Sequence, residues 1–417
     1  MNFQSVCVIG LGYIGLPTAA IIAGNNIAVT GVDTNQQTVD IINRGNIHIV
    51  EVDLDQLVSK VVSNGSLKAV IAPTPADVFI IAVPTPFGPG QAPDMSYVDA
   101  ACKSIAPVLS KGNLVILEST SPVGSTENIS RQLARLRPDL VIAGPDGGVA
   151  DVMIAYCPER VLPGKILQEL VENDRVIGGI TPASSEAARA FYSIFVNGQC
   201  ILTDARTAEM CKLTENSFRD VNIAFANELS ILCDKFRIDV WELIRLANRH
   251  PRVSILQPGV GVGGHCIAVD PWFIVHSAPE EARMIRLARE INDGKVKWSY
   301  SKLKEQLETL SMQLNRKPIV ACLGLAFKPD IDDLRESPAL RFCRTIVSKG
   351  GCEVLAVEPH IERLPEDLLN VRLVDLDEAV DQADIILTLV RHRIFIDKLP
   401  SAPLERAVID FCGLWAQ

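Results

Sequence analysis

The chain has 417 residues, of which 48% are hydrophobic and 22% are charged, and its formal net charge is −10. A single hydrophobic core rarely grows beyond about 250–300 residues, so this length predicts two or three globular domains. The composition excludes a largely disordered chain, and the negative charge disfavours a surface that follows nucleic-acid phosphates.

The sequence also lacks the usual signals of secretion, membrane insertion and metal binding. No basic leader precedes the apolar run at residues 6–9, and the apolar run at 78–83 is far shorter than the roughly 20 residues of a membrane span. The 11 cysteines form no CxxC pair and do not cluster with the 6 histidines. We expect a soluble cytoplasmic protein without metal, membrane or nucleic-acid partners.

The first half of the chain alternates short β-rich runs with amphipathic stretches. Candidate strands lie at residues 6–9, 27–32, 78–83 and 114–117. This alternation predicts a parallel sheet covered by helices, which is a doubly wound α/β domain.

A glycine-rich turn follows the first candidate strand and opens a helix. Its GxGxxG pattern permits a tight turn and a close approach of the backbone to a pyrophosphate at the helix N-terminus, as in Rossmann domains. Asp33 ends the second strand, where a carboxylate binds the ribose hydroxyls and repels a 2′-phosphate. A glycine turn without a ligand is the alternative, but the combination favours NAD. The predicted cofactor contacts in this region are Gly10, Gly12, Tyr13, Ile14, Gly15 and Asp33.

Two further loops follow strands of the same predicted sheet and contain Thr85 and Thr126. Loops at the carboxyl ends of parallel strands line the ligand crevice, so both threonines are candidates for the nicotinamide half of the cofactor. Ordinary turn chemistry explains them equally well.

Residues 207–236 contain neither Gly nor Pro and predict a long helix with one buried stripe. The expected stripe comprises Met210, Leu213, Val221, Phe225 and Leu229. Lys212, Asn216 and Arg219 fall on the opposite face. A solvated polar face is the ordinary explanation, although a lysine beside a nucleotide sugar could deprotonate an alcohol.

A glycine-dense segment runs from Gln257 to Cys266, with Asp270 four residues further on. Such a loop presents its terminal cysteine to a ligand, as a nucleophile requires, whereas most cysteines are buried and inert. Proline-containing loops supply cations suited to a diphosphate. They contain Glu159, Arg160, Val161, Arg249, His250 and Arg252.

Strand signals return at residues 319–323, 354–357, 385–390 and 408–409, after a helical stretch at 280–314. They predict a second, smaller α/β domain. We expect an NAD-binding Rossmann domain at residues 1–200, a central helical domain for dimerisation and catalysis at 201–300, and a UDP-sugar-binding Rossmann-like domain at 301–417.

Many ordered blocks resemble the UDP-glucose/GDP-mannose dehydrogenase family along essentially the whole chain. They are GLGYIGLPTA from Gly10, GVDTN from Gly31, IAVPTPF from Ile81, ESTSPVGST from Glu118, AYCPERVLPG from Ala155, AEMCKLTENSFRDVNIAFANEL from Ala208, NRHPRV from Asn248, GVGGHCIAVDPWF from Gly261 and GLAFKPDIDDLRESPA from Gly324. The resemblance implies two Rossmann-like doubly wound domains joined by a central helical domain with a long connecting helix. It also implies NAD-dependent oxidation of an alcohol to an acid through a cysteine thioester.

The resemblance assigns roles to individual residues. Cys266 would be the nucleophile, Lys212 the proton-transferring residue and Glu159 a candidate for activating water, with Asn216 and Asp270 in support. Arg335 would contact the cofactor. A homodimer is implied, in which Arg252 reaches the neighbouring subunit's substrate. The substrate contacts would be Arg160, Val161, Lys212, Asn216, Arg219, His250, Arg252, Gly263 and Lys328.

Two positions narrow the implied substrate. His265, where UDP-glucose members carry serine, is similar to the N-acetylhexosamine branch, and Ala268 favours UDP-N-acetylmannosamine over UDP-N-acetylglucosamine. The implied pathway is enterobacterial common antigen synthesis. Close relatives can place a basic residue after the position of Trp415, whereas this chain has Ala416 and Gln417, so the resemblance assigns no contact to this segment.

Two other functions compete with this interpretation. A hydroxyacid or 6-phosphogluconate-type dehydrogenase shares the two-domain plan and a catalytic lysine, but it has no use for the GGHC segment. An NAD-sensing scaffold protein would not need Lys212, Asn216, Cys266 and Asp270 together.

Overall fold

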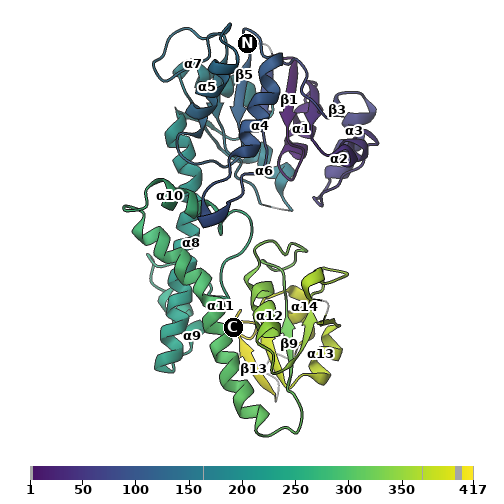
Figure 1. Ribbon diagram of the computed structural model, residues 1–417, viewed down its shortest axis with the longest axis vertical. Helices are drawn as coiled ribbons and strands as arrows, with labels where there is room; N and C mark the ends of the chain where they lie inside the picture. Colours follow the sequence, from purple (N-terminus) through teal and green to yellow (C-terminus); the bar gives the residue numbers. More distant parts are fainter. Residues whose placement is uncertain (1–2, 163, 369, 400–405, 417) are drawn as a thin grey trace. The chain divides into compact units, whose positions relative to one another are not determined.

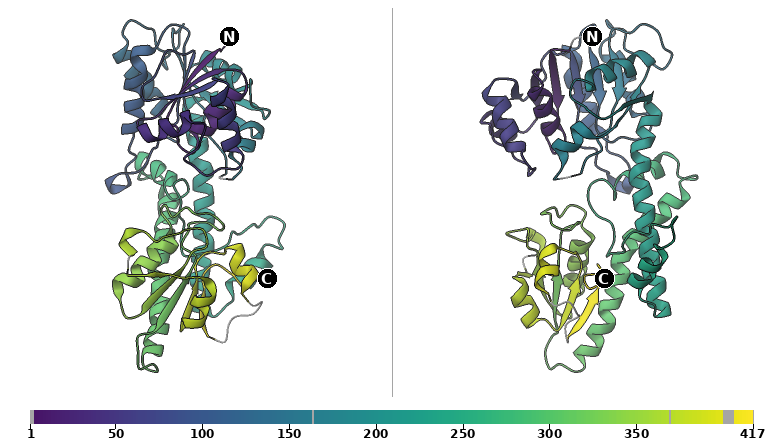
Figure 2. Two further views of the ribbon diagram at one scale, coloured as in Figure 1. Left: turned by 90° about the vertical axis from the view of Figure 1, so that its right-hand side faces the viewer. Right: turned by 180° about the vertical axis from the view of Figure 1, so that it is seen from behind.

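The computed structural model describes residues 3–162, 164–368, 370–399 and 406–416. The chain divides into two compact units, Met1–Thr214 and Glu215–Gln417. Both are α/β units, as the sequence predicts (Figures 1 and 2). Among the described residues, no helix combines the length and the apolar character that crossing a bilayer requires.

The first unit is built on an eight-stranded sheet with the order β3-β2-β1-β4-β5-β6-β7-β8. All neighbouring strands are parallel except β6 and β7, which pair antiparallel. The order reverses direction between β1 and β4, which is where open α/β sheets bind nucleotides. The strands are β1 Ser5–Ile9, β2 Ala28–Val32, β3 Leu67–Val70, β4 Val78–Ile81, β5 Leu114–Leu117, β6 Met153–Tyr156, β7 Arg175–Gly179 and β8 Cys200–Asp204.

Helices cover both faces of this sheet (Figure 1). Along β1, Val6 and Val8 enter one hydrophobic cluster, while Cys7 and Ile9 enter the other. Side chains alternate along a strand, so a strand buried on both faces is apolar at every position. The helices are α1 Gly15–Gly24, α2 Gln36–Asn43, α3 Leu54–Ser63, α4 Ser96–Ile105, α5 Ser125–Leu136, α6 Ile166–Glu172 and α7 Pro182–Tyr192, with short 3-10 turns at Pro89–Gln91 and Ala106–Val108.

The second unit combines long helices with a five-stranded parallel sheet in the order β11-β10-β9-β12-β13. Helix α8 begins in the first unit and ends in the second. The elements are α8 Ala205–Phe236, α9 Val240–Ala247, α10 Asp270–Ser277, α11 Arg283–Ser311, β9 Ile319–Leu323, α12 Pro338–Lys349, β10 Glu353–Val357, a 3-10 turn at Glu366–Leu368, β11 Arg372–Leu373, α13 Leu376–Gln382, β12 Ile385–Thr388, α14 Arg393–Lys398 and β13 Ala407–Asp410.

The predicted apolar stripe of the long helix α8 is wrong, although the helix itself forms. Met210 and Phe225 are 40% and 54% exposed, whereas only Leu213 of the stripe is fully buried. The buried face of α8 is instead rich in polar groups, several of which pair with side chains of α11. Asp220 accepts hydrogen bonds from Arg289 (2.6 Å) and Asn292 (2.8 Å). Buried polar groups are stable when paired in this way, and hydrophobic periodicity does not detect them.

Candidate functional site

The glycine turn between β1 and α1 has the geometry of a dinucleotide-binding turn. Gly10 has φ +93° and donates its N–H to the Val32 carbonyl at 2.8 Å. A Cβ at Gly15 would lie 1.8 Å from the Gly10 carbonyl oxygen, so only glycine fits the start of the helix. A Cβ at Gly12 would meet no described atom within 4 Å. The open side of the turn therefore lies at Gly12.

The groups around this turn fit a dinucleotide. Asp33 is half-buried, and its carboxylate accepts N–H bonds from Leu11 (3.2 Å) and Asn35 (2.9 Å). Ile14 precedes α1 and provides no capping side chain for the first amides of the helix. These amides form the positive end of the helix, where a pyrophosphate binds. Tyr13 is 38% exposed beside them.

The two predicted threonines make contacts within the protein. Thr85 is half-buried and donates its hydroxyl to the Thr120 carbonyl at 2.7 Å. Thr126 is fully buried at the start of α5, and its hydroxyl donates to Glu209 at 2.6 Å. Thr85 lies in the loop after β4, as predicted, whereas Thr126 lies in the first turn of α5 and connects that helix to α8. Their contact with the nicotinamide half stays a prediction.

A buried acid lies close to Lys212 in the first unit. Glu159 is 9% exposed, and its Oε1 has no hydrogen-bond partner among the described residues. Burial raises the pKa of Glu159 to about 7, and the positive charge of Lys212 opposes that rise. Glu159 is therefore poised between its charged and neutral forms near neutral pH, as a general base requires.

A second buried acid, Glu118, lies in the same region. The sequence analysis did not predict that it pairs with Arg175 and Tyr192 in the interior. It forms an ion pair with Arg175 at 3.6 Å and accepts a hydroxyl from Tyr192 at 3.4 Å. Arg175 also stacks over the Tyr192 ring at 5.1 Å. Arg160 is half-buried and donates to the Asp174 carbonyl at 3.2 Å, with Val161 next to it.

Cys266 lies in the turn that leads into α10, in the second unit. Its side chain is half-buried, and its carbonyl accepts N–H bonds from Val269 (3.0 Å) and Asp270 (2.9 Å). Asp270 is 3% exposed and accepts a hydrogen bond of 2.5 Å from the Asn216 amide of α8. The structure thus brings Asn216 and Asp270 together, and Asp270 ties this pair to the cysteine turn.

The glycines before Cys266 are required by close packing. A Cβ at Gly263 would lie 2.7 Å from the Glu336 carbonyl oxygen, and one at Gly264 would lie 2.9 Å from the Phe327 ring. The Gly264 N–H also donates to the Arg335 carbonyl at 3.1 Å. These contacts fix the loop against the segment between β9 and α12, which local sequence could not show.

The remaining predicted contact residues lie at the surface. Arg219, His250, Arg252 and Lys328 are exposed, and the Arg252 N–H donates to His250 Nδ1 at 3.3 Å. Arg335 is also exposed and forms an ion pair with Asp333 at 2.6 Å. Their roles toward substrate and cofactor stay predictions.

A pocket of about 710 Å³ lies in the second unit. Its wall includes residues that come just after β9, β12 and β13, and the carboxyl ends of parallel strands are where α/β sheets bind ligands. Residues from Gln257 to Gly261 form another part of the wall. Sequence reasoning missed several lining residues, although the strand-end rule could have found the first of them. They are Arg391, Trp241 and Arg245.

Comparisons with known proteins cover all three parts of the chain. The NAD binding, central and UDP binding domains of the UDP-glucose/GDP-mannose dehydrogenase family match residues 4–196, 206–294 and 321–416. A UDP-N-acetyl-D-mannosamine dehydrogenase of Campylobacter jejuni is 60% identical over 99% of this chain and 100% of its own length.

Other relatives are almost as similar. An NDP-N-acetyl-D-galactosaminuronic acid dehydrogenase of Ralstonia nicotianae is 57% identical over 100% of this chain and 97% of its own length. A solved structure of a UDP-D-ManNAc dehydrogenase from Pyrococcus horikoshii superimposes with a TM-score of 0.87 and 39% identity, covering 98% of this chain and 96% of that one.

Proposed function

Because this chain belongs to the UDP-glucose/GDP-mannose dehydrogenase family, we propose that it oxidises the 6-hydroxyl of UDP-N-acetyl-D-mannosamine to a carboxylate with NAD. One observation carries the proposal. The loop that forms part of the wall of the 710 Å³ pocket, at Gln257–Gly261, continues within five residues to the half-buried Cys266. A single loop therefore contributes to a nucleotide-sized pocket and presents a thiol.

The first unit fits NAD. Gly12 leaves the pyrophosphate side of the turn open, the first amides of α1 lack a capping side chain, and Asp33 is accessible to a ribose. Bound NAD supplies a hydride acceptor for each of the two oxidation steps. The protein's own residues position the sugar, move protons and form the covalent intermediate.

The thiol makes a four-electron oxidation possible without release of an aldehyde. The first oxidation removes a hydride from C6 and a proton from its hydroxyl. The Cys266 sulfur then bonds to the aldehyde carbon, its proton goes to the aldehyde oxygen, and the resulting thiohemiacetal loses a second hydride and its hydroxyl proton to become a thioester. Water adds to the thioester carbonyl, the carbon–sulfur bond breaks, and the acid leaves with the thiol restored. The expected stoichiometry is two NADH per sugar.

Proton transfer is assigned to Lys212 and Glu159. Lys212 takes the hydroxyl proton, and Glu159 accepts a proton from the hydrolytic water, since its pKa of about 7 suits a base at neutral pH. Asn216 and Asp270 hold the cysteine turn through their hydrogen bond. The pocket supplies Arg245 and Arg391 as cations for the diphosphate.

A homodimer is part of the proposal, with Arg252 contributed to the neighbouring subunit's substrate. Large apolar side chains lie exposed along α8 at spacings of seven and four residues, which are typical of a helix-packing seam. They are Phe218, Phe225, Leu232 and Phe236, with exposed fractions of 67%, 54%, 40% and 64%.

The sugar is tested by measuring NADH release with UDP-N-acetyl-D-mannosamine and its competitors. The galactosamine isomer is the second candidate, because a relative that is 57% identical carries a galactosaminuronic acid name. We expect the highest kcat/KM with the mannosamine sugar, ahead of UDP-N-acetylgalactosamine, UDP-N-acetylglucosamine and UDP-glucose. A clear preference for another sugar would refute the assignment of UDP-N-acetyl-D-mannosamine as the substrate. A cytoplasmic location and a role in enterobacterial common antigen synthesis stay predictions.

The nucleophile is tested with Cys266→Ala, which should bind UDP-sugar normally and form no acid. Cys352→Ala is the matched control, because Cys352 is also half-buried and takes no part in the proposed chemistry. Normal acid production by Cys266→Ala would refute the thioester route.

A further inference from the structure

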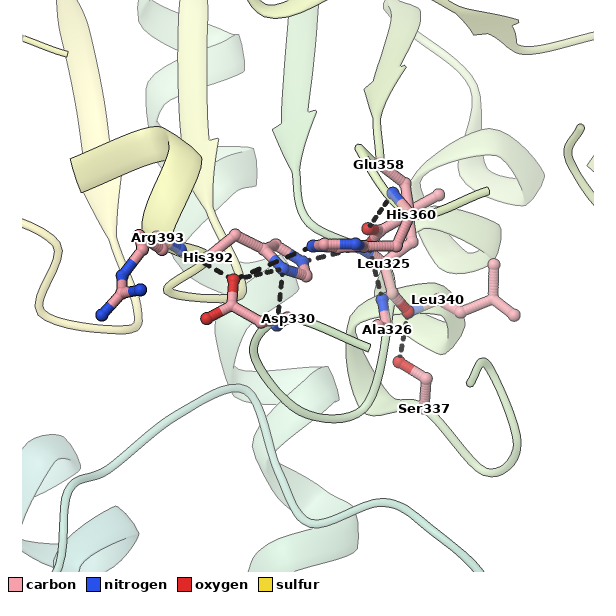
Figure 3. A network of polar contacts seen from close by, with 9 residues as sticks. All are labelled: Leu325, Ala326, Asp330, Ser337, Leu340, Glu358, His360, His392 and Arg393. Carbon is pink, nitrogen blue, oxygen red and sulfur yellow. Dashed lines mark hydrogen bonds and ion pairs between the residues drawn. The ribbon is translucent and has the colours of Figure 1, made fainter. Parts of the chain in front are cut away.

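A compact group of polar side chains ties together loops at the carboxyl edge of the second sheet. Asp330 follows β9, Glu358 and His360 follow β10, and His392 follows β12 (Figure 3). His392 is fully buried, and Glu358 is 4% exposed. Buried polar groups at a loop junction need complete hydrogen bonding, so each bond in this group has a defined donor and acceptor.

The hydrogen bonds fix the tautomer of His392. Its Nδ1 lies 2.9 Å from the backbone nitrogen of Asp330, whose N–H can only donate, so Nδ1 must be the acceptor. The ring proton is therefore on Nε2, which lies 3.2 Å from a carboxylate oxygen of Glu358. His392 is a two-ended bridge that accepts from one loop and donates to another.

Glu358 fastens the other end of this bridge to the turn after β9. Its Oε2 accepts the N–H groups of Leu325 (2.6 Å) and Ala326 (2.9 Å), and its Oε1 accepts the N–H of His360 at 3.2 Å. Burial alone would raise the pKa of Glu358, but the hydrogen bonds that its carboxylate accepts from His392 and the two amides bring the pKa below its ordinary value. Glu358 is therefore a charged, fully bonded anchor.

The Asp330 end is held under strain. Asp330 has φ +60°, a left-handed conformation that is uncommon for a residue with a side chain. Its N–H is held by His392, and its carboxylate oxygen accepts the Arg393 N–H at 2.9 Å. Such a conformation persists only where the surroundings hold it.

Asp330, His360 and His392 could in principle ligate a metal ion, since one ligand atom of each lies within 4.8 Å of the others. The single lone pair of His392 Nδ1 is already used by the Asp330 N–H, so a metal ion that bound this nitrogen would have to break that hydrogen bond. The geometry therefore favours a structural role over a metal site. We call the hydrogen-bonded group of Asp330, Glu358 and His392 the lock.

The locked loops after β9 and β12 are also walls of the nucleotide-sized pocket. Phe327 and Pro329 line the pocket immediately before Asp330, and Val390 and Arg391 line it immediately before His392. The lock sets how far apart these walls lie. We propose that the hydrogen bond from the Asp330 N–H to His392 Nδ1, which joins these two loops directly, positions the pocket walls and so determines affinity for the UDP portion of the substrate, and that the bond from His392 to Glu358 contributes less. This inference rests on the proposed function.

Two substitutions at His392 separate its two ends. In His392→Asn the amide oxygen takes the place of Nδ1 and still accepts the Asp330 N–H, whereas in His392→Gln the amide nitrogen takes the place of Nε2 and reaches only Glu358. We expect His392→Gln to weaken UDP binding about tenfold and His392→Asn to change it less than about threefold. Isothermal titration of the full chain with UDP measures both.

A merely structural role would give a different pattern. For His392→Gln we expect KM for the UDP-sugar to rise while kcat and KM for NAD stay within about twofold, with Tm lowered only by the loss of the bond to Asp330. Equal UDP affinity of folded His392→Gln and wild type would overturn the inference, as would equal losses in both His392 variants. Failure of the wild type to bind UDP would instead overturn the proposed function.

A second pair covers the case in which His392→Gln does not fold. Asp330→Asn keeps the acceptor for the Arg393 N–H and tolerates a left-handed backbone, whereas Asp330→Ala loses both advantages. We expect Asp330→Ala to bind UDP about tenfold more weakly than Asp330→Asn. Equal UDP affinities of the two variants would refute the lock.

Discussion

The two Rossmann-like sheets of this chain begin with the same turn and use it differently. After β1, Gly10 (φ +93°) donates its N–H to Val32 at 2.8 Å; after β9, Gly324 (φ +89°) donates to Val357 at the same distance. In both cases an acid follows the second strand, Asp33 in the first sheet and Glu358 in the second. The backbone frame of the turn is therefore shared.

The surroundings of the two acids differ. Asp33 is half-buried and bonds two backbone amides, so a ribose can reach it. Glu358 is almost fully buried and is bonded by three amides and His392. The helix begins five residues after Gly10 at α1, whereas α12 begins only at Pro338, after a long loop.

The comparison teaches that sheet topology does not by itself make a dinucleotide site. Such a site needs a helix N-terminus at the turn and an acid with free acceptor capacity. The second sheet has neither. Its next helix, α12, begins far from the turn, and its acid, Glu358, anchors a loop that lines the pocket of the second unit. This difference agrees with the matches to an NAD binding and a UDP binding domain.

The largest expected effect comes from Gly15→Ala in the first turn. Its Cβ would collide with the Gly10 carbonyl oxygen at 1.8 Å. We expect the first unit to lose about 3 kcal/mol of stability or more, and NADH formation to cease. Gly12→Ala is the control, since its Cβ meets no described atom within 4 Å. It should unfold at the wild-type Tm and raise KM for NAD at least about tenfold; an unchanged KM would contradict the open-turn interpretation.

Gly324→Ala tests whether the glycine of the second turn is needed for close packing and not for NAD binding. The new Cβ would lie 2.5 Å from Val390 Cβ at a φ of +89°. We expect a loss of about 2–3 kcal/mol of stability, measured by denaturant unfolding, with KM for NAD unchanged. Gly112→Ala has a similar φ of +92° but no described neighbour within 4 Å, so it should cost only about 1 kcal/mol. Equal losses would show that packing at Gly324 is unimportant.

The buried acids of the two units should respond oppositely to pH. The folded-state pKa of Glu159 is raised to about 7 from its ordinary 4.5, so the unfolded chain loses this proton first, and stability falls as the pH rises between these values. An uncharged glutamine at this position does not titrate and should escape that loss.

For Glu358 the sign is reversed. Burial alone would raise its pKa, but His392 and the backbone amides bring it below the ordinary value of 4.5. Its stabilising contribution is therefore present above pH 4.5 and is lost as the pH falls through the folded-state pKa.

Thermal unfolding from about pH 3 to 8 measures both effects. Relative to wild type, we expect the Tm of Glu159→Gln to rise between pH 4.5 and 7, corresponding to on the order of 1–3 kcal/mol. The Tm disadvantage of Glu358→Gln should instead shrink below pH 4.5. A pH-independent Tm difference for Glu159→Gln would contradict the raised pKa of Glu159.

The smallest effect is expected from Asp33→Asn, which leaves the turn intact and removes one negative charge. A neutral amide binds the ribose hydroxyls less strongly and no longer repels a 2′-phosphate. We therefore expect KM for NAD to rise about fivefold and the preference for NAD over NADP to narrow. Glu358→Gln is the matched control in the second sheet and should leave KM for NAD unchanged. An unaltered cofactor preference in Asp33→Asn would show that Asp33 does not contact the ribose.

Local sequence determined the elements and the first turn. The strand expected at residues 114–117 is β5 Leu114–Leu117, and the one expected at 319–323 is β9 Ile319–Leu323. Strands buried on both faces are continuously apolar, and glycine turns need particular residues at fixed spacing, so both leave a local signature.

Only the tertiary structure decided the buried face of α8, the pocket walls and the lock at His392. Asp220 and Arg289 are 69 residues apart in sequence, and Glu358 and His392 are 34 apart. A polar side chain is stable in the interior only when a partner meets it there, and that partner comes from a distant segment. Periodicity along the chain reports apolar burial, so it predicted an apolar stripe on α8 where the fold buries paired polar groups.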